Sequence, residues 1–407
     1  MEKEKTGCGC ESNRGESSTS ISTFDTIMPA PPATSIKISQ EISEDIACCG
    51  PPPGPPASPF EKPGYEIQSW VKDFITTKAG QIPVIKSEMT PKDHLQTAFT
   101  RLNIGRNDYK VSPGLYCTGT PDEDTMVLVT SNYKLSFDHL RKELSGIDAW
   151  IVILDTRGIN VWCAAGKGTF GTEELVKRIK STGISRIVNH RKIIAPQLGA
   201  TGISGREVKK QTGFSIIWGP VHTKDLPGFL KNGLKAEPEM RQVTFSLGER
   251  VVLIPVEISL TFKPAFIVMA LTLLLAGIGP GIFSFTEAWT RGIPALMVLI
   301  AGIIAGTVIT PVFLKQLPGT EFAVKGAVTG IAMSLPVAAI TSYKTGFSGV
   351  TALVLVSVAI SSFLAMNFTG TTPYTSPSGV EKEMRKAIPV QAAATIIAII
   401  LWVYSGF

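Results

Sequence analysis

The sequence predicts an α/β fold with an open, mostly parallel, Rossmann-like sheet, followed by an all-α domain of five transmembrane helices. Two observations carry this prediction. Short apolar runs alternate with helical patterns between about residues 70 and 260, which is typical of a parallel sheet covered by helices. The last third of the chain then contains five apolar runs in series, each close to the roughly 20 residues that cross a bilayer.

Residues 1–64 are rich in Ser, Thr, Glu and Pro and end in a proline-rich stretch. This composition cannot bury a core, so we expect a disordered tail. Its cysteines form two close pairs, Cys8 with Cys10 and Cys48 with Cys49. Two interpretations remain open, an unselected tail and the capture of a soft metal ion by neighbouring thiolates.

Residues 65–260 are expected to form the α/β domain. The expected strands cover residues 126–130, 150–156, 185–189, 192–197, 214–221 and 250–258. The expected helices cover residues 136–144, 172–180, 204–211 and 223–232. Parallel sheets bind ligands at the carboxyl ends of their strands. The loops at residues 130–132, 155–160, 196–202 and 218–222 are therefore the candidate binding loops.

Residues 261–407 are expected to form the transmembrane domain, with spans near residues 265–285, 292–314, 323–341, 348–366 and 388–406. Lys315, Lys382, Arg385 and Lys386 would lie in loops on the side of the amino-terminal domain, whereas the opposite loops hold only Arg291 and Lys344. The positive-inside rule therefore predicts a multi-pass protein of the inner (cytoplasmic) membrane, with the α/β domain in the cytoplasm. The first ten residues lack the apolar core of a secretory signal.

Composition excludes several classes of function. The net charge of +6 is modest and forms no dense basic stripe, so no nucleic-acid partner is expected. The six cysteines form neither a zinc pattern nor an iron–sulfur run. No metal cluster is therefore expected in this chain.

The stretch GINVWCAAGKGTFGT, residues 158–172, follows one of the expected strands. Asn160 is a good N-cap, so Cys163 would lie in the first helical turn with Lys167 at i+4. Backbone N–H groups and a nearby lysine both stabilise a thiolate. A lone cysteine in an α/β domain is more often a small buried hydrophobe, and position alone does not decide between these readings. The glycines do not complete a dinucleotide or P-loop motif.

The segments TMVLVTSNYKLSFDHLR, LDTRGINVWCAAGKGTFGTEELVKRI, NHRKIIAPQLGATGISGREVKKQTGFSIIWGPVHTKDLP and MRQVTFSLGERVVLIPVE resemble the corrinoid-binding domain of the corrinoid iron–sulfur protein of the acetyl-CoA pathway. The resemblance covers roughly residues 100–260. The iron–sulfur protein also carries a cluster motif and a barrel domain, which this sequence replaces with five apolar spans. The combination, with NVWCAAGK, is similar to the HgcA family of membrane-anchored corrinoid proteins in microbial mercury methylation.

The resemblance implies that a short helix bearing Cys163 caps the lower face of a corrinoid, with the Cys163 thiolate as axial ligand to cobalt. The remaining corrinoid contacts that it implies are Thr130, Asn160, Val161, Trp162, Ala164, Ala165, Gly166, Lys167, Gly168, Gln197, Gly199 and Gly219. Small residues in this helix would let its backbone approach a flat macrocycle. For the glycines of the 196–202 and 218–221 loops, a simple turn is an equally good explanation.

The resemblance further implies a methyltransferase that passes a methyl group from methyl-Co(III) corrinoid to Hg(II) and forms methylmercury. A methyltetrahydrofolate-type donor would supply the methyl group, and Cys48 with Cys49, or Cys8 with Cys10, would deliver Hg(II). Because the chain has no iron–sulfur motif, electrons would come from an HgcB-like ferredoxin with two [4Fe–4S] clusters. None of the four histidines lies in the D-x-H-x-x-G motif that supplies a lower ligand in many cobalamin methyltransferases.

Two other functions remain open. One is a corrinoid methyl carrier of acetyl-CoA or one-carbon metabolism with another acceptor. The other is a small-solute transporter with a cytoplasmic sensing domain, which the scarcity of charged residues within the spans disfavours.

Overall fold

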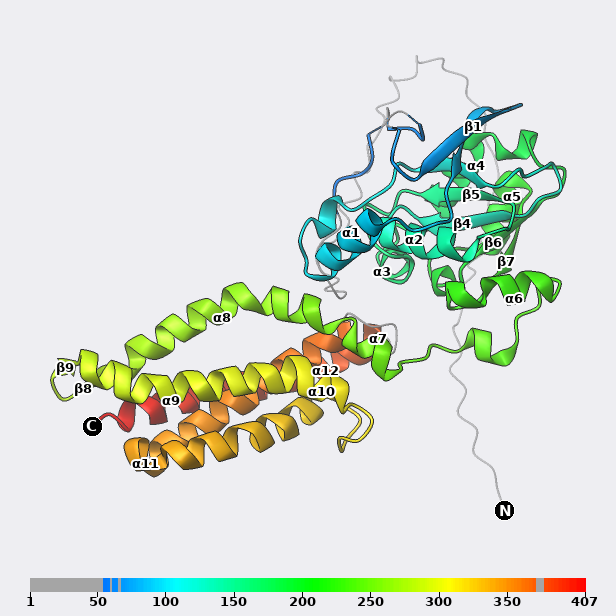
Figure 1. Ribbon diagram of the computed structural model, residues 1–407. Coiled ribbons are helices and arrows are strands. Elements are labelled where there is room, and N and C mark those ends of the chain that lie inside the picture. The colour runs from blue at the N-terminus through cyan, green and yellow to red at the C-terminus, as the bar shows by residue number, and fades with distance from the viewer. Residues whose placement is uncertain (1–53, 59–60, 65–66, 371–376) are drawn as a thin grey trace, which may run out of the picture. The chain divides into compact units, whose positions relative to one another are not determined.

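The computed structural model of the chain describes residues 54–58, 61–64, 67–370 and 377–407 (Figure 1). The expected disordered tail lies almost entirely outside these residues. Cys8, Cys10, Cys48 and Cys49 also lie outside them, so the structure says nothing about their proposed metal capture.

The α/β region contains a seven-stranded sheet with the strand order β1-β2-β3-β5-β4-β6-β7. Strands β5, β4, β6 and β7 run parallel to one another, whereas β3 is antiparallel to β5, and β1 is antiparallel to β2. The predicted mostly parallel α/β sheet is thus confirmed. The strands are β1 Val71–Thr77, β2 Gly80–Ile85, β3 Gly114–Thr118, β4 Val127–Ser131, β5 Ala149–Leu154, β6 Lys192–Ala195 and β7 Ser215–Trp218.

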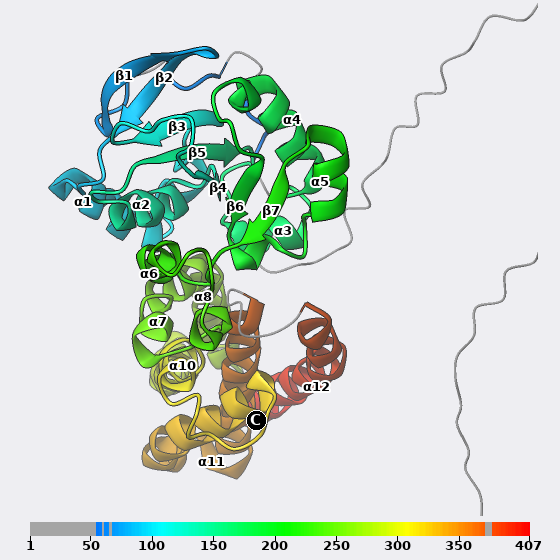
Figure 2. The same cartoon turned by 90° about the vertical axis from the view of Figure 1, so that its right-hand side faces the viewer.

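Helices cover both faces of this sheet (Figure 2). Helices α2 and α6 bury Phe137 and Phe229 against one face, while α3, α4 and α5 bury Ala164, Leu175 and Val208 against the other. The strands between them read as continuous apolar runs because both of their faces are covered. The helices are α1 Pro91–Arg101, α2 Lys134–Glu143, α3 Val161–Gly166, α4 Thr172–Thr182, α5 Gly205–Thr212 and α6 Leu226–Lys231, with single turns at Arg106–Asp108, Ile184–Arg186, Gln197–Gly199, Thr223–Asp225 and Pro238–Arg241.

Two of the predicted strands are wrong. Residues 185–189 follow the C-cap Gly183 and form a 3-10 turn, which buries Ile184, Ile187 and Val188. Residues 250–258 belong to helices α7 Leu247–Val251 and α8 Ile254–Ala276. Their β-branched residues favour a strand, but Ser246 and Glu249 form a capping box that starts a helix. The sequence also gave no prediction for β1, β2, β3 and α1.

Among the residues that the structure describes, five helices are long and apolar enough to cross a membrane, which agrees with the predicted number of spans. They cover Leu247–Ala276, Phe285–Val312, Phe322–Ile340, Thr345–Phe368 and Gly379–Tyr404. The first span consists of α7 and α8, and the second of α9 Phe285–Ile304, a π-helical turn at Ala305–Ile309 and α10 Thr310–Val312. The third and fourth spans lie in α11 Phe322–Gly370, and the fifth lies in α12 Pro377–Tyr404. A short hairpin of β8 Ile278–Gly279 and β9 Ile282–Phe283 lies between the first and second spans. The predicted boundary at residues 260 and 261 falls inside α8.

Small residues let these helices approach closely. A Cβ atom added at Gly306 would lie 2.7 Å from the Ser361 carbonyl oxygen, and one added at Gly330 would lie 3.0 Å from the Val358 Cα. Within the π-helical turn, the Thr310 hydroxyl donates to the Ala305 carbonyl oxygen at 2.8 Å. The buried hydroxyls in this part of the chain thus satisfy backbone groups of an irregular turn.

Candidate functional site

A cavity of about 540 Å³ lies at the carboxyl ends of the parallel strands. Helix α2 follows β4 on one face of the sheet, whereas α3 and α4 follow β5 on the other face. Loops that diverge in this way open the crevice in which α/β sheets bind ligands. The α/β region lines the cavity with Leu128, Val129, Thr130, Ser136, His139, Leu140, Glu143, Asn160, Val161, Trp162, Ile194, Ala195, Pro196, Leu198, Gly219, Pro220, Val221, His222, Thr223, Lys224 and Leu226.

Asn132, which is fully buried after β4, organises the loop that leads into α3. Its side-chain oxygen accepts hydrogen bonds from the Thr156 backbone N–H at 3.0 Å, the Thr156 hydroxyl at 2.9 Å and the Gly158 N–H at 3.0 Å. Its amide nitrogen donates to Asp155 at 3.2 Å. One side chain therefore fixes the path of the β5–α3 loop, and through it the start of α3. The sequence analysis did not single out this residue, although it lies in one of the candidate loops.

Helix α3 begins as predicted at Asn160. The Asn160 side-chain oxygen accepts a hydrogen bond from the Cys163 backbone N–H at 2.9 Å. Cys163 is half-buried in the first turn, and Lys167 forms the C-cap one turn later. Because the cap uses the Cys163 N–H and α3 has six residues, the helix dipole supports a thiolate less than expected.

The small residues of α3 face the protein interior. Ala164 and Ala165 are buried in the core, whereas Gly166 is exposed. Glycines of the neighbouring 196–202 loop accommodate Phe170: a Cβ added at Gly199 would run into the Phe170 ring, and one added at Gly202 would run into the Phe170 carbonyl oxygen. Internal packing thus requires small residues at Gly199 and Gly202.

Replacing Gly202 with alanine is therefore expected to destabilise the α/β region by roughly 1–3 kcal/mol, the usual cost of overpacking a filled core. The added Cβ would also lie 3.1 Å from the Ala165 Cα, so α3 would have to move. Gly205→Ala is the matched control, because its Cβ would meet only Ile216 at 3.6 Å. Thermal unfolding of the full chain measures both, and equal melting temperatures for the two variants would contradict the prediction.

The structure brings only some of the predicted site residues together. Thr130, Asn160, Val161, Trp162 and Gly219 line the cavity. The predicted residues outside its lining are Cys163, Ala164, Ala165, Gly166, Lys167, Gly168, Gln197 and Gly199. Of these, Gln197 accepts a hydrogen bond from Arg241, which also donates to the Gly219 carbonyl oxygen at 3.0 Å.

Two cavity residues were missed, the histidines His139 on α2 and His222 after β7. The His139 ring reaches solvent, but burial by the surrounding protein, followed by the charge of Arg101, lowers its pKa. A lowered pKa favours the neutral form of the His139 imidazole. His222 Nε2 lies 3.0 Å from the Thr244 hydroxyl. No sequence motif marks either residue, because their position depends on how α2 and the loop after β7 meet.

Residues 58–230 match the family model described as CO dehydrogenase/acetyl-CoA synthase delta subunit. A gamma subunit of the acetyl-CoA decarbonylase/synthase complex from Methanopyrus kandleri is 36% identical over 132 residues, which make up 32% of this chain and 28% of that protein. The gamma subunit from Archaeoglobus fulgidus is 30% identical over 166 residues, or 40% of this chain and 35% of that protein. The chain thus spans about a third of the length of these relatives, and the matched part is the α/β region that carries the cavity.

Proposed function

We propose that the α/β region binds a corrinoid and carries methyl groups in one-carbon metabolism, and that the apolar helices hold it at a membrane. The observation that supports this most strongly is that the match to a subunit family of acetyl-CoA synthesis coincides with the cavity at the carboxyl edge of the sheet. The same segment contains the residues that resemble the corrinoid iron–sulfur protein.

The residues present suit a corrinoid, a flat apolar macrocycle with amide side chains. Leu128, Ile194 and Leu198 provide an apolar surface, and Thr130 and Asn160 provide polar groups beside it. The buried Ser131 hydroxyl at the end of β4 has no hydrogen-bond partner among the described residues, so it is an available donor or acceptor near this edge. The cavity of about 540 Å³ can accept part of such a ligand.

A bound corrinoid would supply a cobalt ion as the carrier of the methyl group. In this proposal the Cys163 thiolate would hold that metal, and Trp162 and Val161 would shield it from water. Asn160 holds the first turn of α3, and Asn132 fixes the loop that precedes it. Asn160 and Asn132 would thereby orient Cys163, as outer-shell residues orient the ligands of other metal sites.

The methyl donor in this proposal is a methyltetrahydrofolate-type compound, and a separate ferredoxin of the HgcB type supplies low-potential electrons. In this proposal the chain lies in the cytoplasmic membrane with the α/β region in the cytoplasm. Five helices that are long and apolar enough to cross a membrane support the membrane location, and the positive-inside rule supports the orientation. The relatives are named as subunits of a complex, which supports a function that depends on protein partners.

Hg(II) is a candidate for the methyl acceptor, as an alternative to another acceptor of one-carbon metabolism. The feature that favours it is the combination of the NVWCAAGK stretch with five helices apolar enough to span a membrane, which resembles the mercury-methylating family. Hg(II) is a soft ion that suits an electron-rich methyl group. Methylmercury formation by cells carrying the chain and its ferredoxin partner, compared with cells lacking the chain, tests this acceptor separately.

The absorption spectrum of the purified full chain, loaded with cobalamin, tests the proposed ligand. We expect Cys163→Ala to change the cobalt absorption bands because the axial sulfur is lost. Cys117→Ala is the control: Cys117 is fully buried in β3, and burial, followed by the Asp148 charge, raises the pKa of its thiol to about 12. It is therefore an inert core thiol.

His139→Ala and His222→Ala complete this set of variants. A change in the spectrum with either histidine variant and none with Cys163→Ala would assign the metal to an imidazole. Failure of all variants and of the parent chain to retain cobalamin would reject corrinoid binding itself.

A further inference from the structure

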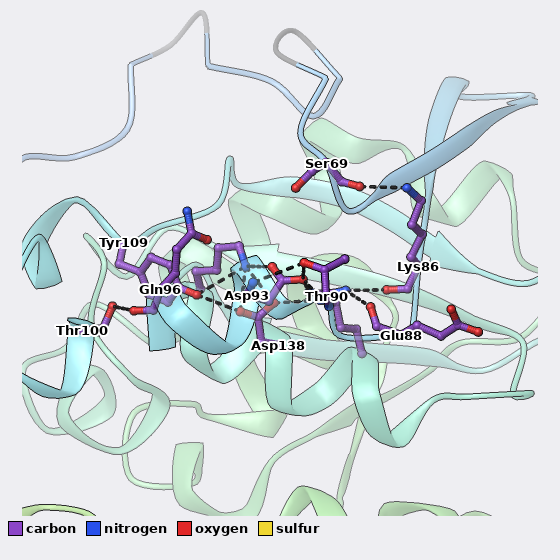
Figure 3. A network of polar contacts seen from close by, with 11 residues as sticks. Ser69, Lys86, Glu88, Thr90, Asp93, Gln96, Thr100, Tyr109 and Asp138 are labelled. Carbon is purple, nitrogen blue, oxygen red and sulfur yellow. Dashed lines mark hydrogen bonds and ion pairs between the residues drawn. The ribbon is translucent and has the colours of Figure 1, made fainter. Parts of the chain in front are cut away.

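Helix α1 is oriented with its polar side inward and its apolar side outward. Asp93 and Thr100 are buried on its inner side, where Asp93 joins a network of charged residues with Lys134 and Arg141 of α2 (Figure 3). On the outer side, Leu95 is 55% exposed, Phe99 43% and Leu102 44%. These three positions follow the i, i+4, i+7 spacing that places side chains on one helix face. Soluble domains normally bury such a face.

The orientation of α1 is fixed by strong contacts. Lys134 Nζ lies 3.1 Å from Asp93 Oδ1, and Arg141 Nη2 lies 2.9 Å from Asp93 Oδ2. Thr90 and Asp93 also form a capping box at the start of the helix. Turning α1 to bury its apolar face would remove a paired carboxylate from two buried cations, so the outward apolar face is a stable feature of the fold.

The charges beside this face are mostly basic. Lys92, Arg101 and Arg106 lie on α1 or in the turn after it and outnumber the exposed Asp108 of that turn. The acidic residue of the helix itself, Asp93, is buried and paired. Exposed Ile104 extends the apolar face just beyond the helix end. Apolar side chains flanked by lysine and arginine are typical of helices that lie in the interface of an anionic membrane.

The chain also keeps this face near a bilayer. Helix α6 ends at Lys231, and the first apolar span begins at Leu247. A linker of roughly 15 residues reaches at most about 50 Å when extended. The α/β region is therefore always within reach of the surface that the apolar helices cross, which raises the effective concentration of lipid at α1.

We propose that the outer face of α1, formed by Leu95, Phe99, Leu102 and Ile104, inserts into the headgroup region of an anionic lipid surface. Lys92, Arg101 and Arg106 contact lipid phosphates. The charged network joins α1 to α2, whose residues Ser136, His139 and Glu143 line the cavity. Membrane contact by α1 thereby orients the cavity relative to the bilayer. The proposal does not depend on which ligand the cavity takes.

The test uses the full chain in nanodiscs made of equal parts of phosphatidylcholine and phosphatidylglycerol. A fluorescent amino acid is incorporated at Phe99, and in a second sample at the exposed Lys209 of α5 as the control. Lipids that carry a nitroxide quencher near the headgroup are then added to the discs. We expect severalfold stronger quenching at position 99 than at position 209, and a loss of this difference when Lys92, Arg101 and Arg106 are changed to glutamine.

Equal quenching at positions 99 and 209 would overturn the proposal. A blue-shifted emission at position 99 in detergent as well as in nanodiscs, without lipid quenching, would show instead that a protein surface covers α1, either of this chain or of another. Circular dichroism and the thermal unfolding curve of each variant establish that the fold is retained, so a negative result cannot be ascribed to unfolding.

Discussion

Replacement of Cys163 by alanine is expected to reduce methyl transfer by more than about a hundredfold, because loss of even an outer-shell partner of a metal ligand costs about 10- to 100-fold. Alanine preserves the short helix, since Cys163 contributes to the Asn160 cap only through its backbone N–H. The effect would therefore arise from the missing sulfur. Product formation from a methyl donor in membranes that contain the chain and its reductant measures it.

Three further variants make this result specific. Cys117→Ala should retain activity, because the Cys117 side chain is buried and lies in the sheet core. Cys163→Ser should lose most of it, since a hydroxyl is a poor substitute for a thiolate ligand. Asn160→Ala should show an intermediate loss through the weakened cap. Full activity of Cys163→Ala would remove the sulfur from the mechanism while leaving corrinoid binding untouched.

The elements that the sequence predicted well are those whose signals are local. Strand β5 is an uninterrupted apolar run and β4 begins as one. Helices α4 and α5 are amphipathic and are followed by Gly183 and Gly213 in left-handed conformations. The N-cap at Asn160 is likewise a local signal, and the structure confirms it. The five spans follow from length and hydropathy alone.

The errors arise where two local signals compete or where tertiary packing decides. The run at residues 250–258 has strand propensity, but the capping box at Ser246 starts a helix before it. Tertiary packing also gives the glycines of the 196–202 loop a role that the sequence does not reveal, because Gly199 and Gly202 accommodate Phe170. His139 lines the cavity because α2 packs on the sheet through Phe137 and Leu140, a relation that no single segment encodes.

Asp138→Asn is expected to have the largest effect on stability, about 3–5 kcal/mol, which is the usual cost of breaking a buried ion pair by removing one partner. Asp138 accepts hydrogen bonds from Lys134 and from Arg141, each at 2.7 Å, and from the Tyr109 hydroxyl at 3.1 Å. All of these charged groups are buried, so the substitution leaves two cations to share the single carboxylate of Asp93. Thermal or denaturant unfolding of the full chain measures the change.

The exposed ion pair between Lys78 and Glu123 provides the control, because surface pairs contribute little. Glu123→Gln should therefore leave the melting temperature almost unchanged, and an equal loss in both variants would contradict the assigned role of burial.

The network also predicts that the folded state is sensitive to acid. Burial alone would raise the pKa of Asp93, but hydrogen bonds from Thr90 and Lys134 outweigh burial and hold that pKa well below its usual range. A carboxyl with a depressed pKa stabilises the folded state above its ordinary pKa of about 4 and loses this contribution as the pH falls further. Asp93→Asn should accordingly lower the stability at neutral pH and flatten its decline below about pH 4.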